Sequence, residues 1–126
     1  MITIKRFYFF FPLLALLGCS SSEITYKFEA TMIDIGKVTK GKESVARFEF
    51  KNVGKNEILI KEVKLDCHCT KANYSKEKIK SGQTGFVHVF YDNHKIGFFE
   101  QTINVYFNND DNPPVLLLFR GIVENK

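Results

Sequence analysis

The residues between Glu43 and Asn52 alternate strictly between apolar and charged side chains, and this alternation constrains the fold more than any other feature. The apolar set is Ala46, Phe48 and Phe50, and the charged set is Arg47, Glu49 and Lys51. A period of two is typical of a strand that buries one face and leaves the other in water. The sequence therefore predicts a half-buried antiparallel strand in this segment.

The chain beyond residue 30 repeats this strand pattern between turn signals, and no segment keeps an apolar period of 3.6 residues. Further strands are predicted over residues 31–36, 58–66, 86–91, 102–107 and 115–123, and residues 73–79 are a loop or a short edge strand. About seven such strands at regular spacing predict an all-β, Ig-like β-sandwich of antiparallel strands. The chain has no Trp, and its last two cysteines are close in sequence, so the inter-sheet disulfide and core tryptophan of Ig domains are not expected.

The first 18 residues have the three parts of an export signal. Lys5 and Arg6 form the charged start, residues 7–17 form an apolar run, and Gly18 precedes Cys19. The run is shorter than the roughly 20 residues of a membrane-spanning helix. Residues 16–19 resemble the bacterial lipobox, which implies cleavage before Cys19 and lipidation of its thiol. An uncleaved anchor and an ordinary secretory signal are the alternatives.

These features divide the chain into a lipoprotein signal peptide (1–18), a lipidated cysteine with a polar tether (19–30) and one sandwich domain (31–126). The residue after Cys19 is Ser20 and not Asp, which by resemblance to envelope sorting rules favours the outer membrane. We therefore expect a protein of the bacterial cell envelope whose first partner is the membrane, reached through the lipid anchor.

The charge and the motifs of the chain exclude several classes of function. The formal net charge is +4, and it moves toward neutral once Lys5 and Arg6 leave with the signal peptide. Nucleic-acid-binding proteins carry a clustered basic face, so no nucleic-acid partner is expected. The sequence lacks a Gly-x-Ser-x-Gly turn, a His-Glu-x-x-His helix and a Gly-rich phosphate loop, and it is not predicted to be an enzyme. Asp110 and Asp111 precede two prolines and indicate a solvated turn instead of a calcium loop.

Several spaced residues carry a resemblance to a known family. They are Phe48-x-Phe50-x-Asn52-x-Gly54, Leu59-x-x-x-Val63, Cys67-x-Cys69-Thr70, Gly82-x-x-Gly85, Gly97-x-Phe99 and Gly121. The set is similar to domain-of-unknown-function family 1573 between Met32 and Val123. This resemblance implies an exported bacterial protein, often a lipoprotein, with an Ig-like sandwich, and it implies no activity. The chain departs from the family at His68, where Gly is usual.

Cys67 and Cys69 follow the predicted strand directly and leave three interpretations open. Exported thiols normally form disulfides, yet Cα atoms two residues apart in a strand lie about 6.5–7 Å apart, at the limit for a bridge. The pair is therefore either structural, as buried thiols or a strained bridge, or functional. A soft-metal site for copper or zinc would use both thiolates with His68, or with His88 or His94. A thiol-redox site would use His68, Lys64 and Lys71 to lower the thiol pKa.

Apolar side chains also fall on the strand faces that are predicted to point outward. They are Phe86, Phe90, Phe98, Tyr106, Leu116 and Leu118, and Phe86, Phe90, Leu116 and Leu118 make up the predicted partner surface. Either the faces are misassigned or a partner covers them, because large exposed apolar patches mark interaction sites. The preferred hypothesis is a non-enzymatic interaction or scaffold module that binds another envelope protein. The alternative is a metal or thiol-redox accessory protein that uses Cys67, His68 and Cys69, with copper or zinc as its only suggested cofactor.

Overall fold

The computed structural model describes residues 12, 18, 25–108 and 113–125, and all regular structure in these residues is β-strand. None of them belongs to a helix long and apolar enough to cross a membrane. Cys19, most of the predicted signal peptide and the Asp110–Asp111 pair lie outside the described residues. The strands are β1 (Tyr26–Phe28), β2 (Met32–Thr39), β3 (Ser44–Asn52), β4 (Ile60–Leu65), β5 (Thr70–Tyr74), β6 (Thr84–Tyr91), β7 (Gly97–Phe107) and β8 (Val115–Glu124).

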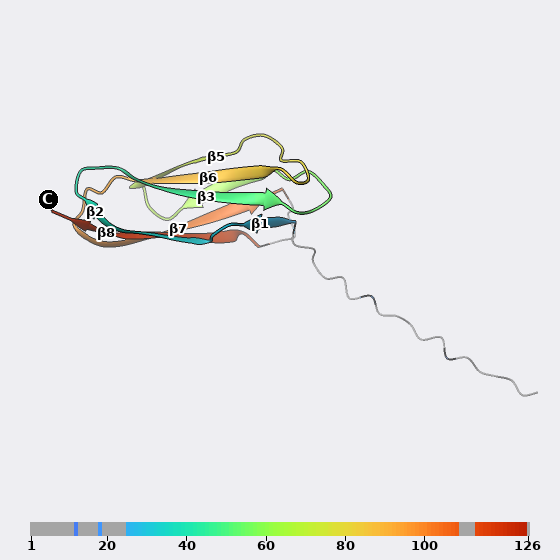
Figure 1. Cartoon of the computed structure of the whole chain (residues 1–126), viewed down its shortest axis with the longest axis horizontal. Helices are drawn as coiled ribbons and strands as arrows, with labels where there is room; N and C mark the ends of the chain where they lie inside the picture. Colours follow the sequence, from blue (N-terminus) through green and yellow to red (C-terminus); the bar gives the residue numbers. More distant parts are fainter. Residues whose placement is uncertain (1–11, 13–17, 19–24, 109–112, 126) are drawn as a thin grey trace, which may run out of the picture.

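The strands form two four-stranded sheets that pack face to face (Figure 1). The β3 sheet has the order β1-β3-β6-β5, and the β8 sheet has the order β2-β8-β7-β4. This is the ABED and CFG arrangement of an Ig constant-type domain, with β2 added beside β8. The predicted all-β, Ig-like sandwich is confirmed.

Two details differ from the sequence prediction. The described chain has eight strands instead of about seven, because β1 lies inside the segment predicted to be a tether. Three residues are too few to show a period of two. In addition, β2 pairs with β8 in parallel, whereas every other pairing between strands is antiparallel. The chain reaches this arrangement by leaving the β3 sheet after β1 and joining the β8 sheet as β2.

The core lies between the sheets and is made from the inward residues of each alternating strand. In β3, Ser44, Ala46, Phe48, Phe50 and Asn52 are buried, as the sequence predicts for the apolar set. The other predicted inward sets are also buried: Val87, Val89 and Tyr91 on β6, Ile103, Val105 and Phe107 on β7, and Leu117 and Phe119 on β8. Alternation in the sequence therefore assigned the faces of the long strands correctly.

Asn52 ends β3 and is fully buried at the edge of this core. Its side-chain nitrogen donates hydrogen bonds to the carbonyl oxygens of Asn56 and Ile79, both at 2.8 Å. Its side-chain oxygen accepts the N–H of Gly54 at 3.0 Å. One amide thus fixes the turn after β3 and ties it to the segment that precedes β6, which explains the spacing of Asn52 and Gly54.

Candidate functional site

Cys67 and Cys69 lie in the connection that carries the chain from β4 of one sheet to β5 of the other. Strand β4 ends at Leu65, so the cysteines lie in the turn that follows this strand and do not have the extended spacing of strand residues. The N–H of Thr70 donates to the carbonyl of Cys67 at 3.3 Å and closes this turn. The turn brings the two Cα atoms to 5.2 Å, which is within the range of a disulfide, and the sulfurs are bonded to each other.

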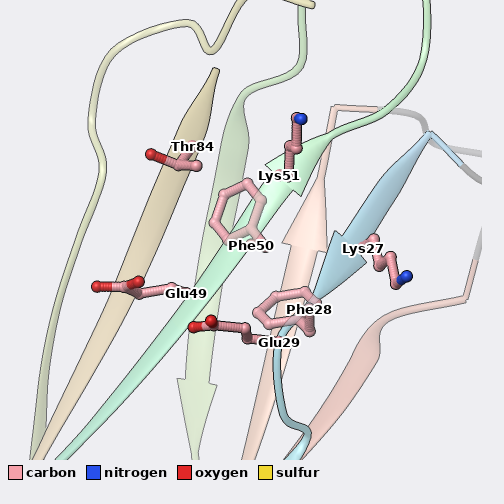
Figure 2. A pocket seen from close by; sticks show the side chains of 7 residues that line it. All are labelled: Lys27, Phe28, Glu29, Glu49, Phe50, Lys51 and Thr84. Atoms are coloured by element: carbon pink, nitrogen blue, oxygen red, sulfur yellow. The ribbon is translucent and has the colours of Figure 1, made fainter. Parts of the chain in front are cut away.

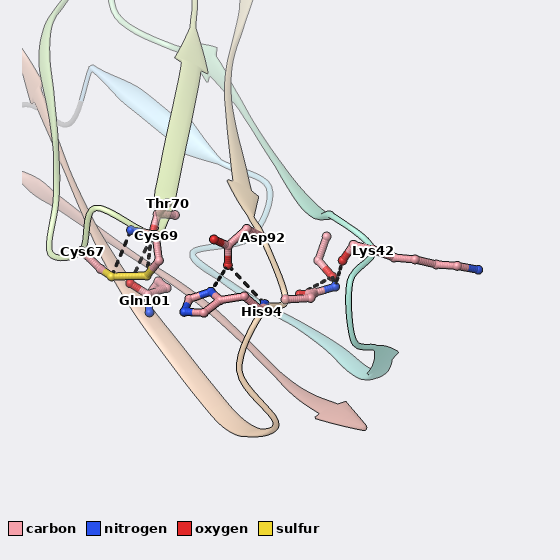
Figure 3. A network of polar contacts seen from close by, with 9 residues as sticks. Lys42, Cys67, Cys69, Thr70, Asp92, His94 and Gln101 are labelled. Atoms are coloured by element: carbon pink, nitrogen blue, oxygen red, sulfur yellow. Dashed lines mark hydrogen bonds and ion pairs between the residues drawn. A yellow bond between two sulfur atoms is a disulfide. The ribbon is translucent and has the colours of Figure 1, made fainter. Parts of the chain in front are cut away.

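Hydrogen bonds attach the disulfide turn to both sheets (Figure 3). The N–H of Cys69 donates to the sulfur of Cys67 at 3.2 Å. The buried Thr70, at the start of β5, donates its hydroxyl to the side-chain oxygen of Gln101 on β7 at 3.2 Å. Both cysteines are half-buried, so the bridge stays within reach of a small reactant. This arrangement supports thiol–disulfide chemistry at a fixed point between the sheets.

The structure separates the histidines that the sequence offered as partners of the thiols. His68 is exposed in the turn, and its φ is not positive, since Asn93 is the one described non-Gly residue with a positive φ. His88 points outward from β6 and stacks on Phe86, with ring centroids 4.5 Å apart. His94 hydrogen-bonds to Asp92, and this bond lowers the pKa of the Asp92 carboxyl.

Metal binding at this turn would require free thiolates. Across residues 25–108 and 113–125, no three His, Cys, Asp or Glu side chains are grouped to hold a metal ion. Both sulfurs are engaged in the disulfide, and the thiolate is the form that ligates a metal. Copper or zinc would therefore bind here only after reduction of the bridge.

The structure divides the predicted partner surface between two faces. Phe86 and Phe90 point outward from the β3 sheet, and Leu116 and Leu118 point outward from the β8 sheet. Each side chain faces outward as predicted, but the four do not form one surface because β6 and β8 belong to different sheets. Two separate surfaces have to be considered.

The outer face of the β8 sheet exposes most of the large apolar side chains that reach solvent in the described chain. Phe98 is 66% exposed, Leu116 52%, Met32 48% and Ile122 42%, and the other two exposed large hydrophobic residues are in loops. Phe86 and Phe90, on the opposite face of the molecule, are only partly exposed. The β8 sheet therefore presents the stronger candidate for a docking surface.

A row of charges crosses this outer face between its apolar ends. Asp34 on β2 and Glu100 on β7 both lie opposite Arg120 on β8. The Nε of Arg120 donates to Asp34 at 3.0 Å, and the N–H of Gly36 donates to the other carboxylate oxygen at 2.9 Å. The hydrogen bond from Gly36, with that from Arg120, lowers the pKa of Asp34. Glu100 is exposed beside this pair.

The β3 sheet carries a shallow pocket of about 450 Å³ near the point where β1 ends (Figure 2). Its lining residues are Lys27, Phe28, Glu29, Glu49, Phe50, Lys51 and Thr84. The strand register puts Lys27 opposite Lys51, and like charges in this position repel each other. The rim of the pocket therefore carries charges of both signs. The sequence did not predict the pocket because it did not predict β1.

Comparisons with known proteins agree with this architecture. The family model described as "Protein of unknown function (DUF1573)" matches residues 26–123. A protein of unknown function from Porphyromonas gingivalis W83 is 17% identical with a TM-score of 0.67, and the match covers 78% of this chain and 46% of that one. The VesB protease of Vibrio cholerae is 10% identical with a TM-score of 0.67, over 78% of this chain and 32% of that one.

A third solved structure matches over nearly its whole length. The human CEP192 PapD-like domain 7 is 11% identical with a TM-score of 0.63, and the match covers 81% of this chain and 87% of that one. This chain spans less than half of the two bacterial proteins, and at such identities the likeness concerns the fold alone. The search of curated proteins found no match.

Proposed function

The chain belongs to the DUF1573 family of proteins of unknown function, and from this premise we propose that it is a non-enzymatic interaction module of the bacterial cell envelope. The observation that carries the proposal is the outer face of the β8 sheet, where Phe98, Leu116, Met32 and Ile122 are 42–66% exposed. Burial of a large apolar side chain contributes roughly 1.5–3 kcal/mol when it is complete. Such a face gains stability when a partner covers it.

The anchor is part of the same proposal. Residues 16–19 resemble a lipobox, so Cys19 carries lipid chains that hold the protein at the membrane. Each buried methylene contributes about 0.8 kcal/mol, and two or more chains anchor a protein stably. Ser20 directs the protein to the outer membrane. The sandwich then meets its envelope partner at the membrane surface.

The test compares two matched variants of the full-length chain that differ only in the face they alter. Leu118→Lys places a charge on the outer face of the β8 sheet, and Phe90→Lys places one on the outer face of the β3 sheet. Partners are fixed by chemical crosslinking in intact cells and identified by mass spectrometry. We expect Leu118→Lys to lose the crosslinked partner and Phe90→Lys to keep it. Equal crosslinking by wild type and Leu118→Lys, with unchanged thermal melts, would refute the proposal.

A second candidate function is favoured by the bridge between Cys67 and Cys69. A disulfide that closes so short a loop contributes about 1.6 kcal/mol by chain entropy, against about 3 kcal/mol for a 15-residue loop. The bridge therefore contributes little to the stability of the fold. The alternative function is that of a thiol-redox or soft-metal accessory protein. Cells that carry Cys67→Ser/Cys69→Ser should then grow poorly under copper or oxidative stress. Normal growth of these cells, with normal amounts of the variant protein, would exclude this role.

A further inference from the structure

We propose that the outer face of the β8 sheet binds a second copy of this chain around a two-fold axis that runs along the strands between β7 and β8. The inference rests on the proposed interaction function and names its partner. Face-to-face sheets pack about 10 Å apart with nearly aligned strands. A two-fold axis makes both copies use the same surface, so that surface has to complement itself.

The strand register shows that the outer face of the β8 sheet complements itself in this way. An axis along the strands exchanges β7 with β8, so each β8 residue faces the β7 residue of the second copy at the same level. Ile122 is level with Phe98, and Arg120 is level with Glu100. Each copy thus presents Ile122 to the phenylalanine of the other and Arg120 to the glutamate of the other. One apolar contact and one ion pair form twice across the axis.

Arg120 is able to hold two carboxylates in this arrangement. Its Nε donates to Asp34 at 3.0 Å within the chain. A guanidinium has five N–H donors in a fixed fork, so the terminal nitrogens remain for Glu100 of the second copy. Arg120 and Asp34 are each partly exposed in one copy, with side-chain exposures of 36% and 48%. The second copy would cover both groups and supply a partner of opposite charge.

The charged row also decides between a second copy and a lipid surface. A membrane would bury Asp34, Arg120 and Glu100 against hydrocarbon without a partner for the exposed carboxylate. A second copy supplies that partner and also covers Phe98, the most exposed large hydrophobic residue of the described chain at 66%. The apolar and the charged residues of this face therefore both favour a second copy of the chain as its partner.

The size of the face predicts a weak dimer. The four strands have 8, 10, 11 and 6 residues, at about 3.4 Å per residue and about 4.8 Å between strands. The footprint is therefore roughly 570 Å² per copy, below the roughly 800 Å² per partner of a standard stable interface. We expect a dissociation constant on the order of micromolar for the chain in solution.

The test exchanges charges between two copies. Full-length chains with two different affinity tags are produced in the same cells, and the amount of one that co-purifies with the other is measured. Glu100→Arg paired with itself puts two arginines at each ion pair, and Arg120→Glu paired with itself puts two glutamates there. Each like pair should co-purify at least about tenfold less than wild type. Mixed Glu100→Arg and Arg120→Glu copies restore opposite charges and should recover.

Two further variants separate this face from the rest of the protein. Phe98→Lys should reduce co-purification, whereas Phe90→Lys on the β3 sheet should not, and thermal melts show whether each variant folds. The inference is overturned if mixed copies co-purify no better than like copies, or if Phe98→Lys has no effect. If the charge exchange fails while Leu118→Lys still abolishes crosslinking to another envelope protein, the dimer is wrong and the interaction function stands. If neither responds, both are wrong.

Discussion

The change Asn52→Ala should destabilise the sandwich strongly, although Asn52 lies outside the proposed functional surfaces. Asn52 is 0% exposed, and its amide makes three hydrogen bonds to the backbone. Two of them hold the carbonyls of Asn56 and Ile79, and the third holds the N–H of Gly54. Alanine removes all three bonds and leaves the volume of the amide empty.

The expected loss of stability depends on which hydrogen-bond partners the backbone groups keep after the substitution. A hydrogen bond contributes a net 0.5–1.5 kcal/mol, so three bonds contribute about 3 kcal/mol. No penalty for a buried group without a hydrogen bond is added. The Ile79 carbonyl also accepts the N–H of Ile58 at 3.0 Å, and the Gly54 N–H also donates to the Thr25 carbonyl at 3.2 Å. Asn56 is exposed, and water can replace its lost donor. The expected loss in free energy of unfolding is therefore about 3 kcal/mol.

Urea unfolding measures this loss directly. The chain has five Tyr and no Trp, so far-ultraviolet circular dichroism or tyrosine fluorescence reports the transition. Asn73→Ala is the matched control, because Asn73 is exposed on β5 and should change stability by less than about 0.5 kcal/mol. Asn52→Asp keeps the acceptor for Gly54 but turns a carboxylate toward two carbonyls, and it should destabilise at least as much as alanine. A loss below about 1 kcal/mol in Asn52→Ala would refute the reasoning.

Three further predictions concern the core, the charged row and the bridge. Gly85→Ala would place a Cβ 2.4 Å from side-chain carbons of Ile79 and Phe50, and urea unfolding should show a loss of about 1–3 kcal/mol. The lowered pKa of Asp34 means that its ionised form stabilises the fold above its ordinary value of 3.8 and that this contribution is lost as pH falls below it. Wild type should therefore melt higher than Asp34→Asn at about pH 7 and equally at about pH 2. Cys67→Ser/Cys69→Ser should lose about 1.6 kcal/mol in non-reducing urea unfolding, and a loss above about 4 kcal/mol would contradict the chain-entropy argument.

The sequence predicted the inward faces of β3, β6, β7 and β8 correctly because alternation is a local property of each strand. A strand that buries one face must alternate, whichever strand lies beside it. The same reasoning missed β1, whose three residues are held in place by pairing with Phe50 and Asn52 across the sheet and not by a pattern of their own. Short edge strands depend on their neighbours.

Local sequence patterns did not determine which strands share a sheet or how the turns between them are shaped. Strands β6 and β8 both carry apolar outward residues, and only the pairing of β6 with β3 and β5 puts it in a different sheet from β8. The distance between Cys67 and Cys69 was estimated from strand geometry, in which Cα atoms two residues apart lie about 6.5–7 Å apart. Because β4 ends at Leu65, the cysteines lie in a turn, where their Cα atoms are 5.2 Å apart and a disulfide forms.

Cross-strand neighbours decide whether an outward apolar residue stays exposed. On the β3 sheet, Phe86 lies opposite Glu49, and Phe90 lies between Lys71 and Val45. Long charged side chains therefore stand beside both rings, which are only partly exposed. On the β8 sheet, Leu116 lies opposite Asn104 and Phe98 lies opposite Ile122, and both are more than half exposed. Leu118, between Thr102 and Met32, is only partly exposed. Short or apolar neighbours therefore leave Leu116 and Phe98 uncovered. Outward apolar residues in the sequence therefore have two outcomes, and the side chains on the neighbouring strands decide which of the two surfaces stays exposed.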